Sequence, residues 1–184
     1  MAKAKGTTLF TLVKFLRSQR EAARERLSPD LRHYLEEQIQ PALWYPEEDL
    51  LALIRVMLEL LPLSREEALA QMGCTIAREH LEGIYEHLRV DEQAGFENLS
   101  RRTYVLWASM HDTGRLVARL EAEARASFEL RDYGVPSPEM CSIMSAYFSE
   151  TLRMAGVVDP DVRKLECRAD GAPTCRWEAS WRNS

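Results

Sequence analysis

The chain has 184 residues, of which 29% are charged and 46% are hydrophobic. This composition is typical of a folded protein with its own core and excludes a disordered chain. The formal net charge is −5, and the Lys and Arg residues form no basic block, so we expect no nucleic-acid partner.

The N-terminus lacks the layout of a signal peptide, because Lys14 interrupts the apolar run and no small-residue cleavage site follows. The longest apolar stretch, residues 50–63, contains Arg55, Glu59 and Pro62 and is too short to cross a bilayer. We therefore expect a cytoplasmic protein without membrane insertion. In that compartment its four cysteines are free, metal-bound or reactive rather than disulfide-paired.

The first half of the chain predicts a series of helices. Apolar residues recur at helical spacing in the predicted helices, which cover residues 7–19, 28–39, 45–61, 64–88 and 98–112. Ser28 followed by Pro29 is a typical helix start, and Ser64 with Glu67 forms a predicted capping box. Three acidic residues after Pro46 suit the positive end of a helix dipole.

At Gly114 the hydrophobic period changes from 3.6 to 2. Apolar residues occupy even positions of the next segment (Leu116, Ala118, Leu120, Phe128 and Leu130), which predicts a hairpin with one buried face. A helix follows over residues 137–156, where Ser137 is the cap and Gly156 ends the helix. Odd positions are apolar in the last segment (Leu165, Cys167, Cys175, Trp177, Ala179 and Trp181), which predicts a second hairpin that turns at Asp170-Gly171.

The predicted fold class is therefore α+β: a helical N-terminal half followed by ββαββ, with a four-stranded antiparallel sheet packed on helices. We expect a single domain over residues 1–184. Its helical part, residues 1–95, includes the helices expected to form a homodimer, and residues 96–184 hold the last helix of the series and the ββαββ part.

Three cysteines are predicted to converge. The alternation turns Cys167 and Cys175 to the core face of the last hairpin, and a symmetric turn would place their Cβ atoms about 5 Å apart. Cys141 lies near the start of the helix between the hairpins. Three thiolates and one further ligand would form a closed tetrahedral zinc site. The alternative is that all three are small buried apolar residues.

Three stretches of the sequence resemble the 4-vinyl-reductase-type small-molecule-binding domain: "QMGCTIAREHLEGIY", "MCSIMSAYFSETLRMAG" and "ECRADGAPTCRWEASW". Ala77 stands where a second glycine is common in this family. The superfamily also contains haem–nitric-oxide-binding domains and the Bet-type subunits of the TRAPP vesicle-tethering complex. With the order of elements, the resemblance covers residues from about Gly6 to Trp181.

The resemblance implies a structural zinc, because matching cysteines hold zinc together with a glutamate in the phenol-sensing regulators of this family. Cys141, Cys167 and Cys175 would be the ligands here. Glu121, Glu123 and Glu129 lie in the right hairpin to supply the fourth ligand, but the alternation puts them on its polar face.

A haem domain of this superfamily would need a proximal histidine and a Tyr-x-Ser-x-Arg motif. The motif is absent, so the sequence predicts no haem. His80 and His87, seven residues apart on one helix, are expected to be solvated. His111 is either a hydrogen-bond donor in a pocket or the polar end of a core helix.

Aromatic and methionine side chains could line a ligand cavity or simply form the core. The resemblance favours a cavity between helices and sheet. The predicted ligand-binding residues are Tyr104, Trp107, His111, Phe128, Met144, Tyr147 and Phe148.

No catalytic motif is present in the sequence: it contains no Gly-rich phosphate loop, HExxH or GxSxG. We therefore expect a non-enzymatic sensory or adaptor domain that binds a small apolar ligand and signals through a dimer or an unknown protein partner. The alternatives are a ligand-free scaffold that resembles TRAPP subunits and, last, an enzyme similar to tetrapyrrole vinyl reductases.

Overall fold

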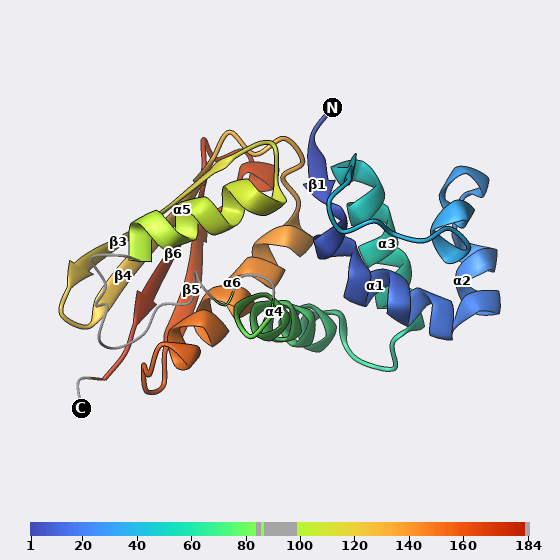
Figure 1. The fold of residues 1–184 in the computed structure, drawn as a ribbon. Coiled ribbons are helices and arrows are strands. Elements are labelled where there is room, and N and C mark those ends of the chain that lie inside the picture. Colours follow the sequence, from blue (N-terminus) through green and yellow to red (C-terminus); the bar gives the residue numbers. More distant parts are fainter. Residues whose placement is uncertain (84–85, 87–98, 183–184) are drawn as a thin grey trace.

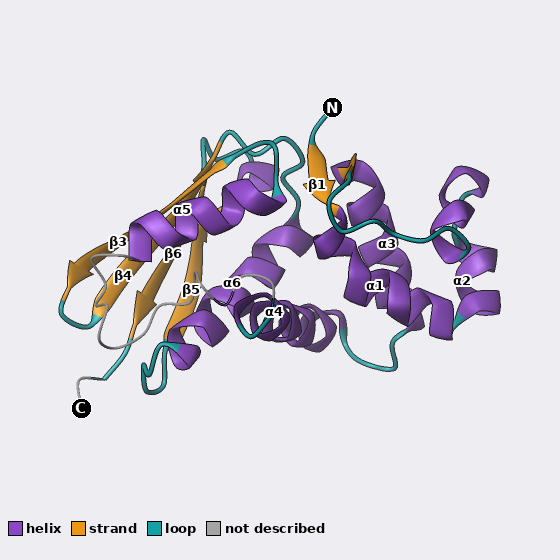
Figure 2. Ribbon diagram, viewed as in Figure 1, coloured by secondary structure: helices purple, strands orange, loops and turns teal. Residues whose placement is uncertain are grey.

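The computed structural model describes residues 1–83, 86 and 99–182 of the chain. It has two groups of elements, an all-helical group at the N-terminal end and a sheet with its covering helices at the C-terminal end (Figures 1 and 2). Two separate clusters of buried apolar side chains correspond to these groups. We call the two groups the N-terminal lobe and the C-terminal lobe.

The N-terminal lobe is built from helices and one small two-stranded sheet. Its elements are β1 (Lys3–Lys5), α1 (Gly6–Ser18), α2 (Arg20–Arg26), η1 (Pro29–Leu35), β2 (Trp44–Pro46) and α3 (Glu47–Leu60). The segment after Ser28 begins at Pro29 as expected but forms a 3-10 helix. Strands β1 and β2 pair antiparallel and were not predicted, because strands of three residues carry no measurable alternation.

Helix α4 (Arg65–Leu81) packs along α6 (Pro138–Met154), and side chains of both helices reach the cores of both lobes. The predicted capping box at Ser64 and Glu67 is present at the start of α4. Gly73 allows the close approach of the two helices, because a Cβ atom there would lie 2.3 Å from the backbone oxygen of Ile143. The continuation of this helix to residue 88 and the predicted boundary at residue 95 lie outside the described residues.

The C-terminal lobe confirms the α+β class and the four-stranded antiparallel sheet. Its elements in chain order are α5 (Leu99–Met110), β3 (Arg115–Ala122), β4 (Arg125–Arg131), α6, β5 (Asp161–Glu166), η4 (Arg168–Asp170) and β6 (Cys175–Ser180). The strand order in the sheet is β3-β4-β6-β5. Ala118, Phe128 and Trp177 turn toward α5 and α6 and are almost fully buried.

Two strand residues that were predicted to face the core are exposed instead. Leu120 is 46% exposed and Leu165 is 51% exposed. A register shift interrupts β3 between Leu120 and Ala122, and another interrupts β5 between Lys164 and Glu166. The irregularity in β5 inserts Leu165 as an extra residue, so strict alternation no longer predicts its face. Leu120 keeps its register with Ala126 and is exposed near the end of the edge strand β3.

The last hairpin also turns differently from the prediction. The connection between β5 and β6 contains the 3-10 turn η4, and Gly171 ends this turn with φ +92°. A longer loop therefore replaces the expected two-residue turn. Among the residues described, no helix combines the length and the apolar character that crossing a membrane requires.

Candidate functional site

A cavity of about 70 Å³, which we call the inner cavity, lies at the boundary between the two lobes. Thr8, Leu50 and Ile54 line it from the N-terminal lobe. The remaining lining residues come from α4, α5, α6 and the sheet: Met72, Ile76, His80, Thr103, Leu106, Trp107, Met110, His111, Leu116, Phe128, Met140, Ile143, Met144, Tyr147, Phe148 and Thr151. Its wall is mainly apolar, with two histidines.

Six of the seven predicted ligand-binding residues line this cavity: Trp107, His111, Phe128, Met144, Tyr147 and Phe148. Tyr104 lies outside it and is 46% exposed. Helix α5 turns Thr103, Leu106, Trp107 and Met110 toward the cavity, whereas Tyr104 lies beside this stripe under the Arg115 guanidinium.

His111 joins the two lobes at the edge of the cavity. Its Nδ1 atom is hydrogen-bonded to the carboxylate of Glu47, the first residue of α3, and both side chains are buried. The imidazole is stacked on Trp107 with ring centroids 4.0 Å apart. Burial, together with the nearby Glu47 carboxylate, raises the pKa of Tyr133, whose ring meets His111 edge-on.

The N-terminal strand reinforces this junction. The backbone N–H of Lys3 donates to the Asp112 carboxylate over 2.6 Å, and the N–H of Asp112 donates to the Lys3 carbonyl over 3.0 Å. The N–H of Glu47 donates to the Ala2 carbonyl over 3.0 Å. The contact between His111 and Glu47 is therefore held by backbone bonds on both sides.

His80 is buried in the wall, so the expectation of a solvated histidine is wrong at this position. It is 7% exposed, and burial, with a smaller contribution from His111, lowers its pKa to about 4. The imidazole is therefore neutral at physiological pH. The sequence pattern missed it because His80 lies on the buried side of α4 with Ala77 and Leu81, directly beside the exposed Glu79. His87 lies outside the described residues.

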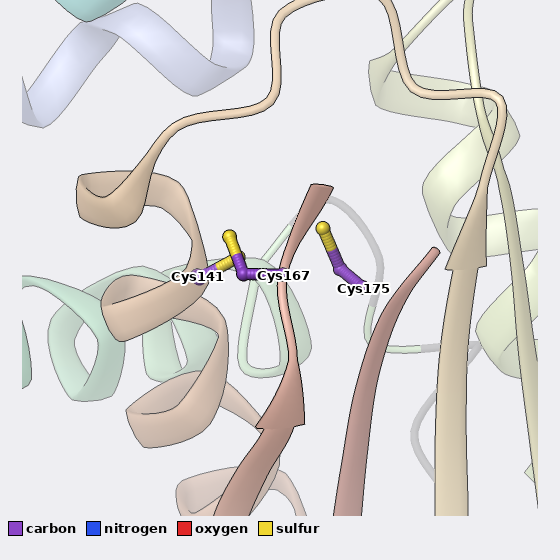
Figure 3. Close-up of side chains that lie close together, drawn as sticks. All are labelled: Cys141, Cys167 and Cys175. Atoms are coloured by element: carbon purple, nitrogen blue, oxygen red, sulfur yellow. The ribbon is translucent and has the colours of Figure 1, made fainter. Parts of the chain in front are cut away.

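The three predicted cysteines are brought together (Figure 3). The sulfur atoms of Cys141, Cys167 and Cys175 are buried and all lie within 4.8 Å of one another. Cys141 comes from the first turns of α6, Cys167 follows β5, and Cys175 begins β6. The Sγ atoms of Cys141 and Cys167 are 3.0 Å apart.

Hydrogen bonding favours the thiolate form of Cys175. The Cys141 side chain and the backbone N–H of Arg168 both donate toward its sulfur and lower its pKa to about 6. The same contact and burial raise the pKa of Cys141. One sulfur is thus prepared to carry negative charge, which a soft metal ion requires of its ligands.

None of the three glutamates proposed as a fourth ligand belongs to this cluster among the described residues. Glu129 pairs with Arg131 over 2.5 Å, and Glu121 accepts from Ser127 over 2.5 Å. Glu121 and Glu129 line the polar face of the sheet, opposite the core, as the alternation predicted.

No family model matches this chain, and no curated protein matches it. Solved structures with a similar fold do match it. An H-NOX protein from S. oneidensis in the Fe(II)NO ligation state has a TM-score of 0.68 at 12% identity, over 97% of this chain and 99% of that chain. A mutant of the T. tengcongensis H-NOX has a TM-score of 0.69 at 15% identity, over 97% and 98%. The fold of this chain is thus similar to that of H-NOX domains.

A third structure, described as probing haem distortion in the H-NOX family, has a TM-score of 0.68 at 15% identity, over 97% of this chain and 95% of that chain. This likeness overturns the prediction of no haem. The absence of the Tyr-x-Ser-x-Arg motif is not enough to exclude haem, because the chain shares its fold with proteins described as haem proteins. The likeness is consistent with the predicted superfamily, which includes such domains.

Proposed function

We propose that this chain is a sensor module that binds a small molecule in the inner cavity. The observation that carries the proposal is that both lobes line one mainly apolar cavity. A ligand there contacts the N-terminal and the C-terminal lobe at once. It therefore binds with different affinity to arrangements in which the lobes are closer or further apart, and so shifts their populations.

The cavity volume sets the size of the ligand in this arrangement. An apolar cavity of about 150 Å³ holds benzene. A volume of about 70 Å³ therefore suits a molecule of a few heavy atoms. Larger ligands require the lobes to separate, at the cost of the contact between His111 and Glu47.

Haem is a candidate ligand because the fold is similar to that of H-NOX domains. Imidazole nitrogen is a common axial ligand of haem iron, and His80 and His111 both lie on the cavity wall. The donor type therefore suits haem, whereas the volume of the cavity suits it only after the lobes separate. The haem of an H-NOX-like domain would make the chain a gas sensor, and an apolar ligand would make it a sensor of organic molecules.

Methionine methyl groups offer a direct test, because Met110, Met140 and Met144 line the cavity whereas Met1 is 89% exposed. We expect xenon, a single apolar atom that enters dry apolar cavities, to shift the methyl NMR signals of the cavity methionines and to leave Met1 unchanged. Equal small shifts at all methionines would contradict the proposal and favour the ligand-free scaffold.

Haemin is the second probe. Specific binding would give a shifted Soret band that the double substitution His80→Ala and His111→Ala removes while far-UV circular dichroism shows that the variant is still folded. A Soret band that is identical in the variant would show that haemin adheres elsewhere. In that case the xenon result alone supports ligand binding in the inner cavity.

We further propose that the cysteine cluster holds a structural zinc. A zinc ion bound to three thiolates would join α6 to the strands β5 and β6 and leave one position for a non-cysteine ligand or water. In a compartment that keeps thiols reduced, such as the cytoplasm, the thiolates stay available for the metal.

We also propose that the chain is a 4-vinyl-reductase-type module without enzymatic activity. The 4-vinyl-reductase-type label is supported by the three motifs and by the cysteine cluster, and a non-enzymatic role is supported by the apolar wall of the cavity. We also propose one domain that forms a homodimer through its N-terminal helices. Light scattering of the purified protein tests this directly: a mass of 21.2 kDa is that of the single chain.

A further inference from the structure

A second cavity of about 240 Å³, which we call the outer cavity, opens between α1, α3 and α4. Leu12, Phe15, Met57, Leu61, Ala68, Met72 and Ile76 are its apolar lining residues. It shares Thr8, Met72, Ile76 and His80 with the inner cavity. The two cavities are therefore neighbours, separated by these four side chains.

The polar lining of the outer cavity consists of hydrogen-bonding groups on two facing helices. Helix α1 contributes Thr7, Thr8 and Thr11, and helix α4 contributes Gln71, Thr75 and Glu79. The Thr11 hydroxyl donates to the Glu79 carboxylate and so bridges the two helices. A carboxylate has about four acceptor positions, so this bond leaves Glu79 able to accept further hydrogen bonds from a ligand.

The charge of the outer cavity is negative. Glu79 is the formally charged residue among its described lining residues, and none of them is Lys or Arg. His80, at the layer between the cavities, is held neutral by burial.

Nearby basic side chains are directed elsewhere. Arg78 pairs with Glu150 on α6 over 2.6 Å, and Lys14 lines a different cavity with Phe10 and Arg17. Lys5 donates to the Ala42 carbonyl and lies over the Trp44 ring. The electrostatics of the outer cavity therefore favour a cation over an anion.

We propose that the two cavities together bind a small aliphatic amine, with its ammonium group at Glu79 in the outer cavity and its hydrocarbon chain directed toward the inner cavity. This inference rests on the proposed function and names the chemical class of the ligand. The Glu79 carboxylate and the threonine hydroxyls accept hydrogen bonds from the ammonium group, and the methionine and aromatic side chains cover the chain.

A matched set of probes tests the proposal: hexylamine, hexanol and hexanoate at pH 7.5 share one chain and differ in charge. Methionine methyl NMR reports binding, because Met57 lines the outer cavity, Met72 lines both, and Met144 lines the inner cavity. Glu79 is exposed, so the ion pair contributes little binding free energy, and we expect hexylamine to bind roughly two- to five-fold more tightly than hexanol. Hexanoate should bind more weakly than either.

The variant Glu79→Gln removes the charge and keeps an acceptor for Thr11. It should abolish the preference for hexylamine while hexanol binds as before. Glu82→Gln, an exposed change just after the same helix, is the matched control and should leave the preference intact.

Equal binding of hexylamine and hexanol, or a preference that survives Glu79→Gln, would overturn the amine proposal. If no hexyl probe binds while xenon still shifts the Met144 signal, the amine proposal fails and the proposed function stands. If xenon also leaves the cavity methionines unchanged, both proposals fail.

Discussion

The Nδ1 atom of His111 is hydrogen-bonded to the Glu47 carboxylate, and this buried contact joins the end of α5 to the start of α3. The two residues are 64 positions apart in the sequence and belong to different lobes. Glu47 is 1% exposed, and its Oε2 atom has no hydrogen-bond partner in the described part of the chain. His111 therefore supplies the hydrogen bond to the other carboxylate oxygen, and the Tyr133 side chain lies close to the same carboxylate.

Replacing His111 with Ala should destabilise the fold strongly. Loss of one partner of a buried pair leaves an uncompensated polar group and costs about 3–5 kcal/mol. Urea denaturation at pH 7 measures this as a lower unfolding midpoint. Glu48→Gln is the matched control for the companion variant Glu47→Gln, because Glu48 is the exposed neighbour in the same helical turn. Equal midpoints for the two glutamate variants would show that the contact is not stabilising.

The pKa of His80 predicts that the protein loses stability between pH 6.5 and about 4. In this range the histidine of the unfolded chain binds a proton, whereas the buried imidazole of the folded chain does not. The unfolded state therefore binds more protons, and the free energy of unfolding falls as the pH falls. The difference between the two pKa values corresponds to roughly 3 kcal/mol of unfolding free energy. This contribution is fully present above pH 6.5 and is lost as the pH falls to about 4.

Carboxylates also titrate in this range, so the prediction is a difference between two proteins. The variant His80→Leu lacks the titrating group and should lose less stability than the natural chain between pH 7 and pH 4.5. Urea unfolding at both pH values gives the comparison. Parallel pH dependence of the two proteins would show that His80 is protonated in the folded state.

The sequence predicted the features that depend on residues close together in the chain. The capping box of Ser64 and Glu67 and the cap at Ser137 involve residues three positions apart, and both are present. The three cysteines were also predicted to converge, because alternation in the last hairpin and the position of Cys141 near its helix start are local facts.

The parts that the sequence did not predict depend on distant packing. Three acidic residues after Pro46 all suit a helix dipole, and nothing local distinguishes the buried Glu47 from its exposed neighbour Glu48. His80 is buried because helices from both lobes cover α4. Leu165 is exposed because of a bulge that alternation does not reveal.

The cysteine cluster predicts one zinc ion per chain. Native mass spectrometry should show the added mass, and the variant Cys175→Ser should lose it together with thermal stability. Cys74→Ser is the control, because Cys74 lies half-buried on α4 outside the cluster. Zinc retained by the Cys175 variant, or absent from the natural chain after purification with reductant and zinc, would contradict the assignment and favour simple packing of the three thiols.

Gly73 allows α4 and α6 to approach closely, and Gly73→Ala should therefore destabilise the protein. Alanine favours a helix over glycine by about 1 kcal/mol. At this position its Cβ atom would lie 2.3 Å from the Ile143 backbone oxygen and 2.7 Å from the Ala146 Cβ atom, so the helices must separate. Overpacking of this kind costs about 1–3 kcal/mol, and the clash involves backbone that cannot yield without moving α6. The clash therefore outweighs the gain in helix propensity.

The comparison for Gly73→Ala is Gln71→Ala, an exposed change on the same helix that should be neutral or slightly stabilising. Thermal unfolding of both variants separates the two effects. Because α6 lines the inner cavity through Met144 and Phe148, separation of the helices should also alter the xenon-induced shift at Met144. An alanine variant that is more stable than the natural chain would show that α4 and α6 are free to move apart, and that the cavity between the lobes is not fixed by their contact.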